Sequence, residues 1–298
     1  HTLSHKSKTL NISCNIFSGM KERVTLTIER SLLEQVDKTV DGSRIKNRSH
    51  AVELMMRKAL GSHQPRKAFV LAGGKGTRLK EIANGLPKPL VPLKGKPILE
   101  YTIDLFKKYG IKDIIIAVGY KAEMIKAHFG DGKKFGVSIS YVEEHDPLGT
   151  AGPLKLAKEH LTSTFVMCNA DELKDIDLND MLVFHSTNRG AATIALTTVE
   201  DPSAYGVAVL NGNKIMTFVE KPDKKNAPSN LINAGLYILE PEIIDYIPEG
   251  FSKIEEDVFP KLASEEKLFG YPFSGQWFDT GTPQRLKLAE KEWRGFLL

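Results

Sequence analysis

The chain has 298 residues, 41% of them hydrophobic and 26% charged, which is the composition of a globular protein long enough for a large domain and a small one. No apolar run approaches the roughly 18 residues of a membrane span, and the first twenty residues lack the apolar core of a signal peptide. The two cysteines, Cys14 and Cys168, exclude a disulfide framework and show no metal-ligand spacing, so we expect a reducing cytoplasm.

Positive charge is concentrated near the start of the chain. The net charge is +4, but residues 1–66 carry +6 and the remainder carries −2. This asymmetry predicts a separate basic module with an anionic partner. Residues 1–20 begin with His1 and are rich in Ser, Thr, Asn and Lys, so we expect a disordered leader or expression remnant, with Met20 as the natural start.

Residues 21–60 predict one strand and two helices. Apolar and polar residues alternate from Arg23 to Ile28, which is the period of a strand. Ser31 is predicted to cap a first helix, with Glu34 placed as in a capping box, and a second helix is predicted from near Ser49. A lone strand has two unpaired edges, so two copies are expected to pair their strands into a ribbon.

This module resembles the ribbon-helix-helix family, whose members dimerise and insert the ribbon into the DNA major groove. The resemblance implies that Arg23, Thr25 and Thr27 face the bases and that the start of the second helix meets phosphate. The alternative is a module that only dimerises, since threonine is weak evidence of base readout. Polar residues 61–66 are predicted to be a linker.

From Lys67 onward, predicted strands alternate with predicted helices. The helices are expected at 98–109, 121–129 and 152–161, between strands at 68–74, 111–119, 137–144 and 164–172. This alternation predicts an α/β domain over 67–298 with a mostly parallel, Rossmann-like sheet. In such sheets, ligands bind beyond the carboxyl ends of the strands, where "AGGKGTR", "GTAG" and "NADE" fall.

The loop "LAGGKGTRL" does not fit the two best-known glycine motifs. A dinucleotide fingerprint would need a third glycine where Leu79 stands, and the order of residues excludes a P-loop. A glycine turn whose backbone can approach an anion remains, with cationic Lys75 and Arg78 in it. Lys88 follows between two prolines, which stiffen the chain around it.

Several motifs occur together in one order. They are "LAGGKGTRL", "PKPLVPLKGKPILEY", "EEHDPLGTAGPL", "NADEL", "YGVAVL", "FVEKP", "NAGLYIL", "IEEDVFPKLA" and "WFDTGTP". With this set, residues 67–290 resemble the sugar-1-phosphate nucleotidyltransferases, also called nucleotide-sugar pyrophosphorylases, whose domain is GT-A-like. Within that family the resemblance is nearest to mannose-1-phosphate guanylyltransferases.

The resemblance implies a reaction in which an NTP and a sugar 1-phosphate give an NDP-sugar and pyrophosphate, with Mg²⁺ as cofactor. The nucleophile is already anionic, so catalysis would consist of positioning and charge neutralisation. The residues implied to bind the nucleotide are Leu71, Ala72, Gly73, Gly74, Gly76, Thr77, Gly149 and Thr150. Those implied to act on phosphates are Arg78, Lys88 and Lys221, those on sugar hydroxyls Gly206, Glu220 and Asn233, and those on the metal Asp171 and Asp279.

Two departures from the family pattern leave the substrate open. Residues 80–85 replace the family's usual Pro-Leu-Thr, and Ala170 stands where the family has glycine. GTP and mannose 1-phosphate are expected as substrates, with a uridylyl- or thymidylyltransferase, or a DNA-binding regulator that senses a nucleotide sugar, as the alternatives. The chain lacks hexapeptide repeats, so the homodimer is expected to form through the N-terminal ribbon.

Overall fold

The computed structural model describes residues 27–79 and 82–297, apart from 41, 43, 44, 46 and 61–66. The chain separates into two compact units, 1–53 and 54–298, with the boundary inside helix α2 (Arg48–Leu60). The predicted linker 61–66 lies outside the described residues, so the predicted domain boundaries stay predictions. Among the residues that are described, no helix has the length and apolar character needed to cross a membrane.

The first helix of the N-terminal module, α1 (Arg30–Lys38), begins two residues earlier than predicted, since Glu29 and not Ser31 stands at its N-cap position. The Ser31 hydroxyl donates to the Glu29 carboxylate at 2.7 Å, and Glu34 accepts from Arg30 Nε at 3.3 Å, so neither side chain forms the predicted cap. At the start of α2, by contrast, Asn47 Oδ1 accepts from the backbone N–H of His50 at 3.0 Å, which is an N-cap bond.

The predicted ribbon strand falls mostly outside the described residues. Positions 23–26, with Arg23 and Thr25, are not described. Thr27 and Ile28, which are described, have no regular secondary structure. The two helices are joined by a bidentate ion pair in which Arg48 donates to both oxygens of Asp37, at 2.7 and 2.6 Å.

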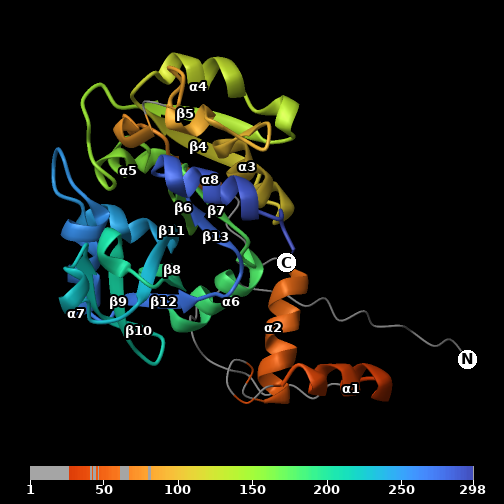
Figure 1. The fold of residues 1–298 in the computed structure, drawn as a ribbon. Helices are drawn as coiled ribbons and strands as arrows, with labels where there is room; N and C mark the ends of the chain where they lie inside the picture. The colour runs from red at the N-terminus through yellow and green to blue at the C-terminus, as the bar shows by residue number, and fades with distance from the viewer. Residues whose placement is uncertain are drawn as a thin grey trace, which may run out of the picture. The chain divides into compact units, whose positions relative to one another are not determined.

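The large unit is built on a nine-stranded sheet in the order β5-β4-β1-β6-β11-β8-β12-β10-β9 (Figure 1). Its strands are β1 (Lys67–Leu71), β4 (Asp113–Val118), β5 (Ser138–Glu143), β6 (Phe165–Asn169), β8 (Ala192–Thr198), β9 (Gly206–Asn211), β10 (Lys214–Glu220), β11 (Leu231–Leu239) and β12 (Leu268–Pro272). The expected α/β class is confirmed.

The prediction of a mostly parallel sheet is wrong for its second half. Strands β5, β4, β1 and β6 are parallel to one another, as the helical crossovers require. Beyond them, β11 is antiparallel to both β6 and β8, and β10 is antiparallel to β12 and β9, while β12 alone runs parallel to β8. Strand β9 also pairs with β11, through Val207 and Ile232, so this half curls back on itself.

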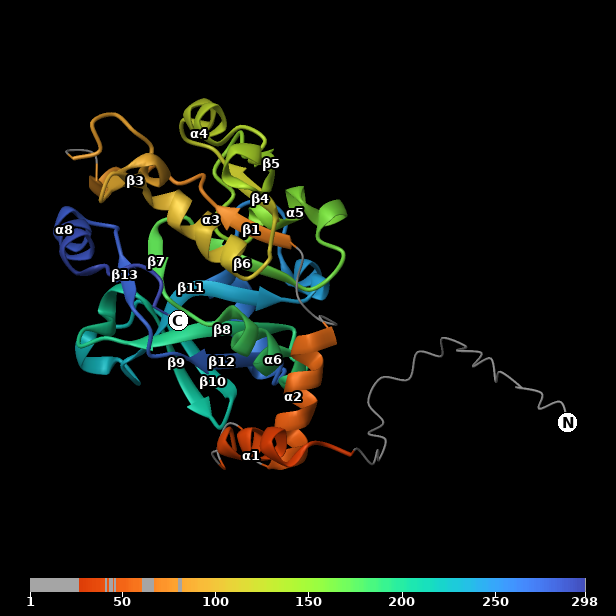
Figure 2. The ribbon, with the colours of Figure 1, turned by 90° about the vertical axis from the view of Figure 1, so that its right-hand side faces the viewer.

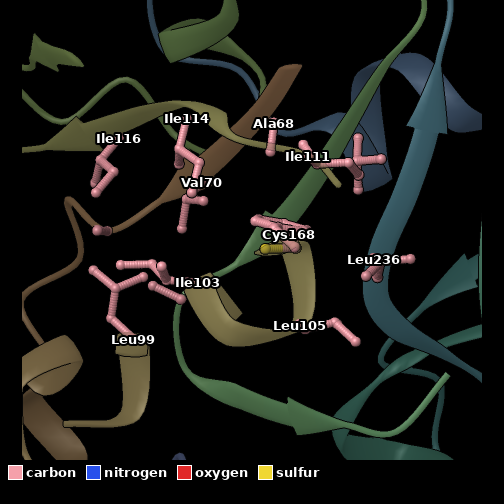
Figure 3. Packing of buried hydrophobic residues seen from close by; sticks show 14 of the residues in the cluster. Ala68, Val70, Leu99, Ile103, Leu105, Ile111, Ile114, Ile116, Cys168 and Leu236 are labelled. Atoms are coloured by element: carbon pink, nitrogen blue, oxygen red, sulfur yellow. The ribbon is translucent and has the colours of Figure 1, made fainter. Parts of the chain in front are cut away.

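Helices cover both faces of the sheet because its strands are apolar on both sides. In β4, Ile114 and Ile116 belong to the core that also contains side chains of α3 (Ile98–Lys108), α4 (Ala122–Phe129) and α6 (Leu178–Asn188). Ile115 belongs to the core that also contains side chains of α5 (Gly152–Leu156) and α7 (Phe259–Ser264). Figure 2 shows α3, α4 and α5 near β1 and β4. Figure 3 shows the first of these cores, in which Val70 lies toward α3. The predicted helix 152–161 is shorter than expected, since α5 ends at Leu156 and a 3₁₀ turn follows.

Short elements at the carboxyl ends of the parallel strands complete the unit. Strands β7 (Glu172–Lys174) and β13 (Trp277–Asp279) pair antiparallel beside α8 (Pro283–Glu292), as Figure 1 shows. Strands β2 (Pro92–Leu93) and β3 (Lys96–Pro97) form a second small ladder. The 3₁₀ turn η1 (Thr77–Leu79) ends the glycine loop, and the 3₁₀ turn η2 (Lys88–Leu90) lies against its Gly76.

Candidate active site

The glycine loop after β1 lies close against its neighbours. A Cβ built on Gly73 would lie 2.2 Å from Glu144 Oε1, and one built on Gly76 would lie 3.0 Å from Cβ of Lys88. Gly76 also has a φ of +57°, which glycine adopts without strain. Gly74 is exposed and has open space around it. The loop therefore presents bare backbone, as an anion-binding loop requires, with the η2 turn against it.

The other predicted nucleotide residues of this segment adjoin the loop. Leu71 ends β1, and the N–H of Ala72 donates to the carbonyl of Ala117 at 2.8 Å, which continues the pairing with β4. Thr77 is exposed at the start of η1. All three thus lie at the carboxyl edge of the parallel strands, where ligands of such sheets bind.

Lys88 and Asp171 form an ion pair although 83 residues separate them. Lys88 lies in η2 with only 9% of its side chain exposed, and Asp171 lies in the turn between β6 and β7. Burial raises the pKa of Asp171, but the charges of Lys88 and Lys174 lower it more, so this pKa lies below its usual range. The structure therefore brings a predicted phosphate-binding lysine and a predicted metal ligand together.

Asp279 ends β13 and is held from three sides. Its carboxylate accepts from the Gly281 N–H at 2.6 Å and from the Tyr205 hydroxyl at 3.3 Å, and it pairs with Arg285 of α8. The loop residue Arg78 reaches the same turn, since a Cβ built on Gly281 would lie 3.4 Å from Arg78 Nη2. Arg78 and Asp279 thus share one edge of the site.

The ladder between β7 and β13 brings the two predicted metal ligands together. It pairs Glu172 with Asp279, and just beyond it the N–H and hydroxyl of Thr280 both donate to the carbonyl of Asp171. Across the described part of the chain, no three or more His, Cys, Asp or Glu side chains are grouped to hold a metal. Two carboxylates nevertheless fit Mg²⁺, which prefers oxygen and takes its other ligands from water and substrate phosphates.

A buried ion pair behind Asp171 was not predicted. Glu172 lies 3.2 Å from Lys174 Nζ and accepts from Asn169 at 3.2 Å and from the Trp277 indole at 3.3 Å. Burial raises the pKa of Glu172 to about 7, against the opposing charge of Lys174. The signal was present as two opposite charges two residues apart in "ELK", which lie on one face of a strand.

The motif around Gly149 and Thr150 is tied to the later "IEEDVFP" segment. Gly149 has a φ of +80°, and a Cβ on it would lie 2.1 Å from the Ser252 carbonyl oxygen. The Thr150 hydroxyl donates to Glu255 and accepts from the Ile254 N–H at 2.9 Å. The described bonds of Thr150 are therefore internal, and they fix this loop.

Glu220 and Lys221 lie on the same side as Thr150. They pair with each other at 2.6 Å, and a Cβ built on Gly206 would lie 2.8 Å from Glu220 Oε2. Burial is the main cause that raises the pKa of Glu255. The charge of Glu220 adds to this rise and the charge of Lys221 opposes it, so both side chains lie near Glu255. Three predicted sugar and phosphate residues are thereby brought to one place.

Asn233 lies in an irregularity of β11, with 9% of the residue exposed. Its amide nitrogen donates to the Tyr237 hydroxyl at 2.9 Å, and its oxygen accepts from the Gly235 N–H at 2.9 Å. Both groups thus support the bend of the strand, and its predicted contact with the sugar stays a prediction.

Two further side chains at the site were not predicted. Arg285 stacks on the Tyr205 ring, with its guanidinium carbon 5.0 Å from the ring centroid, while both bond Asp279. Nothing in their spacing singles them out, because Tyr205 precedes β9 and Arg285 lies in α8.

Of the predicted DNA-facing residues, Arg23 and Thr25 are outside the described residues and Thr27 is exposed.

The arrangement suits transfer between anionic groups. Lys88 and Arg78 supply positive charge at an open glycine loop, and Lys221 supplies it beside Glu220. Asp171 and Asp279 offer carboxylate oxygens at the ladder between β7 and β13. Such a site can hold phosphates and stabilise charge that develops on them.

Comparison with known proteins agrees with this geometry. A family model described as "Nucleotidyl transferase" matches residues 67–294. Mannose-1-phosphate guanyltransferase of Yarrowia lipolytica is 42% identical over 224 residues, which cover 73% of this chain and 61% of that protein. Mannose-1-phosphate guanyltransferase beta-B of Xenopus laevis is 41% identical over 224 residues, with 73% and 62% covered. The chain spans about three fifths of the length of these curated relatives.

Solved structures resemble the large unit as well. A putative glucose-1-phosphate thymidylyltransferase from Bacillus anthracis superimposes with a TM-score of 0.71 at 27% identity, covering 78% of this chain and 96% of that one. HddC from Yersinia pseudotuberculosis, complexed with GMP-PN, has a TM-score of 0.65 at 27% identity, covering 76% and 99%. From the matched span and these identities, the chain belongs to the nucleotidyl transferase family.

Proposed function

We propose that the protein transfers a guanylyl group from GTP to mannose 1-phosphate, giving GDP-mannose and pyrophosphate. A phosphate oxygen of the sugar attacks the α-phosphorus of the nucleotide and forms a new P–O bond. The bond from that phosphorus to the bridging oxygen breaks, and its electron pair leaves on pyrophosphate. Because the nucleophile is already anionic, the protein's task is to hold two polyanions in line against their repulsion.

The observation that carries the proposal is the Lys88–Asp171 pair next to Asp279 at the edge of the glycine loop. Asp171 and Asp279 would hold Mg²⁺, which when bound neutralises charge on the reacting phosphates. Lys88 would hold the phosphates at the reacting centre, Arg78 the departing pyrophosphate, and Lys221 the sugar phosphate. Lys88 and Arg78 lie at the glycine loop, and Lys221 lies beside Glu220.

The names of the relatives support both guanine and mannose, and the position of Glu144 supports guanine. The Glu144 carboxylate lies between Gly73 of the glycine loop and the N–H of Leu148, from which it accepts at 3.0 Å. Guanine presents two adjacent donors, its N1–H and its 2-amino group, and a carboxylate oxygen accepts from such donors. Uracil and thymine present one.

The test is pyrophosphate release with Mg²⁺ over a matrix of nucleoside triphosphates and sugar 1-phosphates. GTP with mannose 1-phosphate is expected to turn over fastest. A faster rate with UTP or dTTP would replace the guanylyltransferase with the alternative transferases. Absence of turnover with every pair would contradict the enzyme and favour the sensor.

The metal assignment has its own test. Asp171→Asn keeps the shape of the side chain but removes the charge, so turnover is expected to fall by about a hundredfold or more. Asp131→Asn is the matched control, because Asp131 is exposed and pairs only locally with Lys133 among the described contacts. Equal rates for wild type and Asp171→Asn would remove Asp171 from the site.

We also propose that the N-terminal module forms the homodimer. Leu32, Met55 and Met56 are exposed on its helices, and such apolar side chains are expected to be covered in a partner interface. Deleting residues 1–60 is expected to convert the dimer into a monomer, as judged from the molar mass measured by light scattering, without loss of turnover. An unchanged mass would contradict the module's role, and DNA retention that falls with salt and with Arg23→Ala would extend it to DNA.

A further inference from the structure

We propose that Thr280 is a positioning residue that couples the two carboxylates of the metal site, Asp171 and Asp279. The inference rests on the proposed function, because it assumes that these carboxylates share a metal. It concerns a residue that contacts neither the metal nor the substrate.

The coupling is visible in the bonds of Thr280. Its exposed fraction is 0%, and its two donors converge on one acceptor, the carbonyl oxygen of Asp171. The N–H donates at 3.2 Å and the hydroxyl at 2.7 Å, across 109 residues of sequence. Thr280 directly follows Asp279, so one peptide unit links the backbone that carries one carboxylate to the backbone that carries the other.

The strand ladder alone stops short of this connection. Strands β7 and β13 pair over three residues on each side and end at Glu172 opposite Asp279. Asp171 lies one residue beyond the ladder, in the turn that leaves β6. The Thr280 N–H extends the pairing to Asp171, and the hydroxyl adds a second bond to the same oxygen. These two bonds tie the backbone of Asp171 directly to the residue that follows Asp279.

The two bonds from Thr280 to the Asp171 carbonyl, here called the Thr280 clamp, connect the two acids in a way that the surrounding charges do not. Lys88 bonds Asp171 and Arg285 bonds Asp279, but these cations come from η2 and α8 and do not bridge the two acids. Two carboxylates brought together repel each other until a cation lies between them. Mg²⁺ tolerates little departure from octahedral geometry. The Thr280 clamp is uncharged, and it fixes the backbone positions of Asp171 and Asp279 relative to each other.

Three variants of Thr280, made in the whole chain, isolate the effect of its hydroxyl, and a variant of Thr282 is the control. Thr280→Val keeps the shape and removes the donor, and Thr280→Ser keeps the donor. Thr280→Ala and Thr280→Ser leave nearly the same space and differ in the hydroxyl, so this pair gives the same comparison if the valine variant does not fold. Thermal unfolding is measured for each, and Thr282→Val serves as a control, since Thr282 caps α8 through its own hydroxyl.

The first readout is Mn²⁺ binding without substrate, followed by the electron paramagnetic resonance signal of the free ion. Loss of the hydroxyl is expected to weaken binding by about tenfold, the size typical of residues that orient metal ligands. Thr280→Ser and Thr282→Val are expected to bind within about twofold of wild type. The inference would be overturned if Thr280→Val bound Mn²⁺ as tightly as wild type, or if Thr280→Ala bound it as tightly as Thr280→Ser. It would also be overturned if the wild type bound no Mn²⁺.

The second readout is the Mg²⁺ concentration that gives half-maximal turnover. It is expected to rise in Thr280→Val while the KM for the sugar phosphate stays unchanged, because the clamp does not touch that substrate. A wild type that binds Mn²⁺ through this clamp but turns over no nucleotide would overturn the proposed function and leave the inference standing.

Discussion

Three carboxylates at the candidate site differ in the cation that faces each of them. Asp171 pairs with Lys88, Asp279 with Arg285, and Glu172 with Lys174. The pKa of Asp171 is lowered, whereas burial raises that of Glu172 to about 7. The two neighbouring acids thus differ in pKa although each pairs with a lysine, because the opposing charges outweigh burial at Asp171 and burial outweighs them at Glu172.

A pH dependence follows for Glu255, the partner of Thr150. Burial raises the pKa of this carboxyl, so the folded protein keeps the proton to higher pH than the unfolded chain does. The free energy of unfolding therefore falls as pH rises from about 4.5 through the raised pKa. Glu255→Gln keeps an oxygen acceptor for Thr150 and lacks this titration. Urea unfolding from pH 4.5 to 8 is expected to show wild type losing stability relative to the variant.

Glu249→Gln is the control with the opposite sign. Glu249 is exposed, and its bond with Lys155 lowers its pKa, so it contributes stability above the unfolded pKa that is lost as pH falls below about 4.5. From pH 4.5 to 8 the stability of wild type relative to Glu249→Gln is therefore expected to stay constant. A free energy of unfolding of wild type, taken relative to Glu255→Gln, that stays constant or rises with pH would contradict the assignment.

The residue types at the site could be read from the sequence better than their partners. Asp171 follows a buried apolar strand, and the two prolines around Lys88 mark a stiff turn, so both positions were predicted. Tyr205 was missed because its bond to Asp279 spans 74 residues, which no local spacing reveals. Glu172 and Arg285 have charged partners close in sequence, but their contacts with Trp277 and Tyr205, which place them at the site, are long-range.

At the scale of elements, the bend in β11 shapes the centre of the site. The pairing with β8 shifts between Asn233 and Tyr237, and Gly235 within the shift has a φ of +59°. A Cβ on Gly235 would lie 2.4 and 2.5 Å from the two oxygens of Glu172. The strand bends here because glycine leaves room for the buried acid of β7.

Gly235→Ala tests this reading against Gly212→Ala. Gly212 also has a φ of +59°, but nothing lies within 4 Å of its Cβ position. Both variants share the left-handed strain of about 1–2 kcal/mol, and overpacking against Glu172 is expected to cost Gly235→Ala roughly 1–3 kcal/mol more. Urea unfolding measures both, and equal losses of unfolding free energy would show that Glu172 yields without cost.

Element types were predictable where period and length agree, and strand direction was not. The strands β1, β4, β5 and β6 were predicted near their observed bounds because long apolar runs alternate with amphipathic helices. The second half also contains apolar strands, but "LINAGLYIL" inserts between β6 and β8 with both neighbours antiparallel. A both-sided apolar run does not reveal that direction, so the sheet was wrongly expected to be mostly parallel.

At the scale of the whole large unit, the site joins segments from its entire length. The glycine loop, the turn after β6, the bend of β11 and the end of β13 meet at one edge, although Gly73 and Asp279 are separated by 206 positions. No contiguous half of the unit contains the site. Loss of either half is therefore expected to abolish binding rather than weaken it.

The position of β11 in the sheet has a consequence for synthesis on the ribosome. The parallel half is complete at Asn169, but β11 begins only at Leu231. While the intervening residues emerge, β6 has one unpaired edge, made of the apolar segment Phe165–Asn169, and open edges of this kind recruit strands from other chains. The stretch from β7 to β10 thus sets how long the nascent chain stays exposed to aggregation before β11 closes that edge.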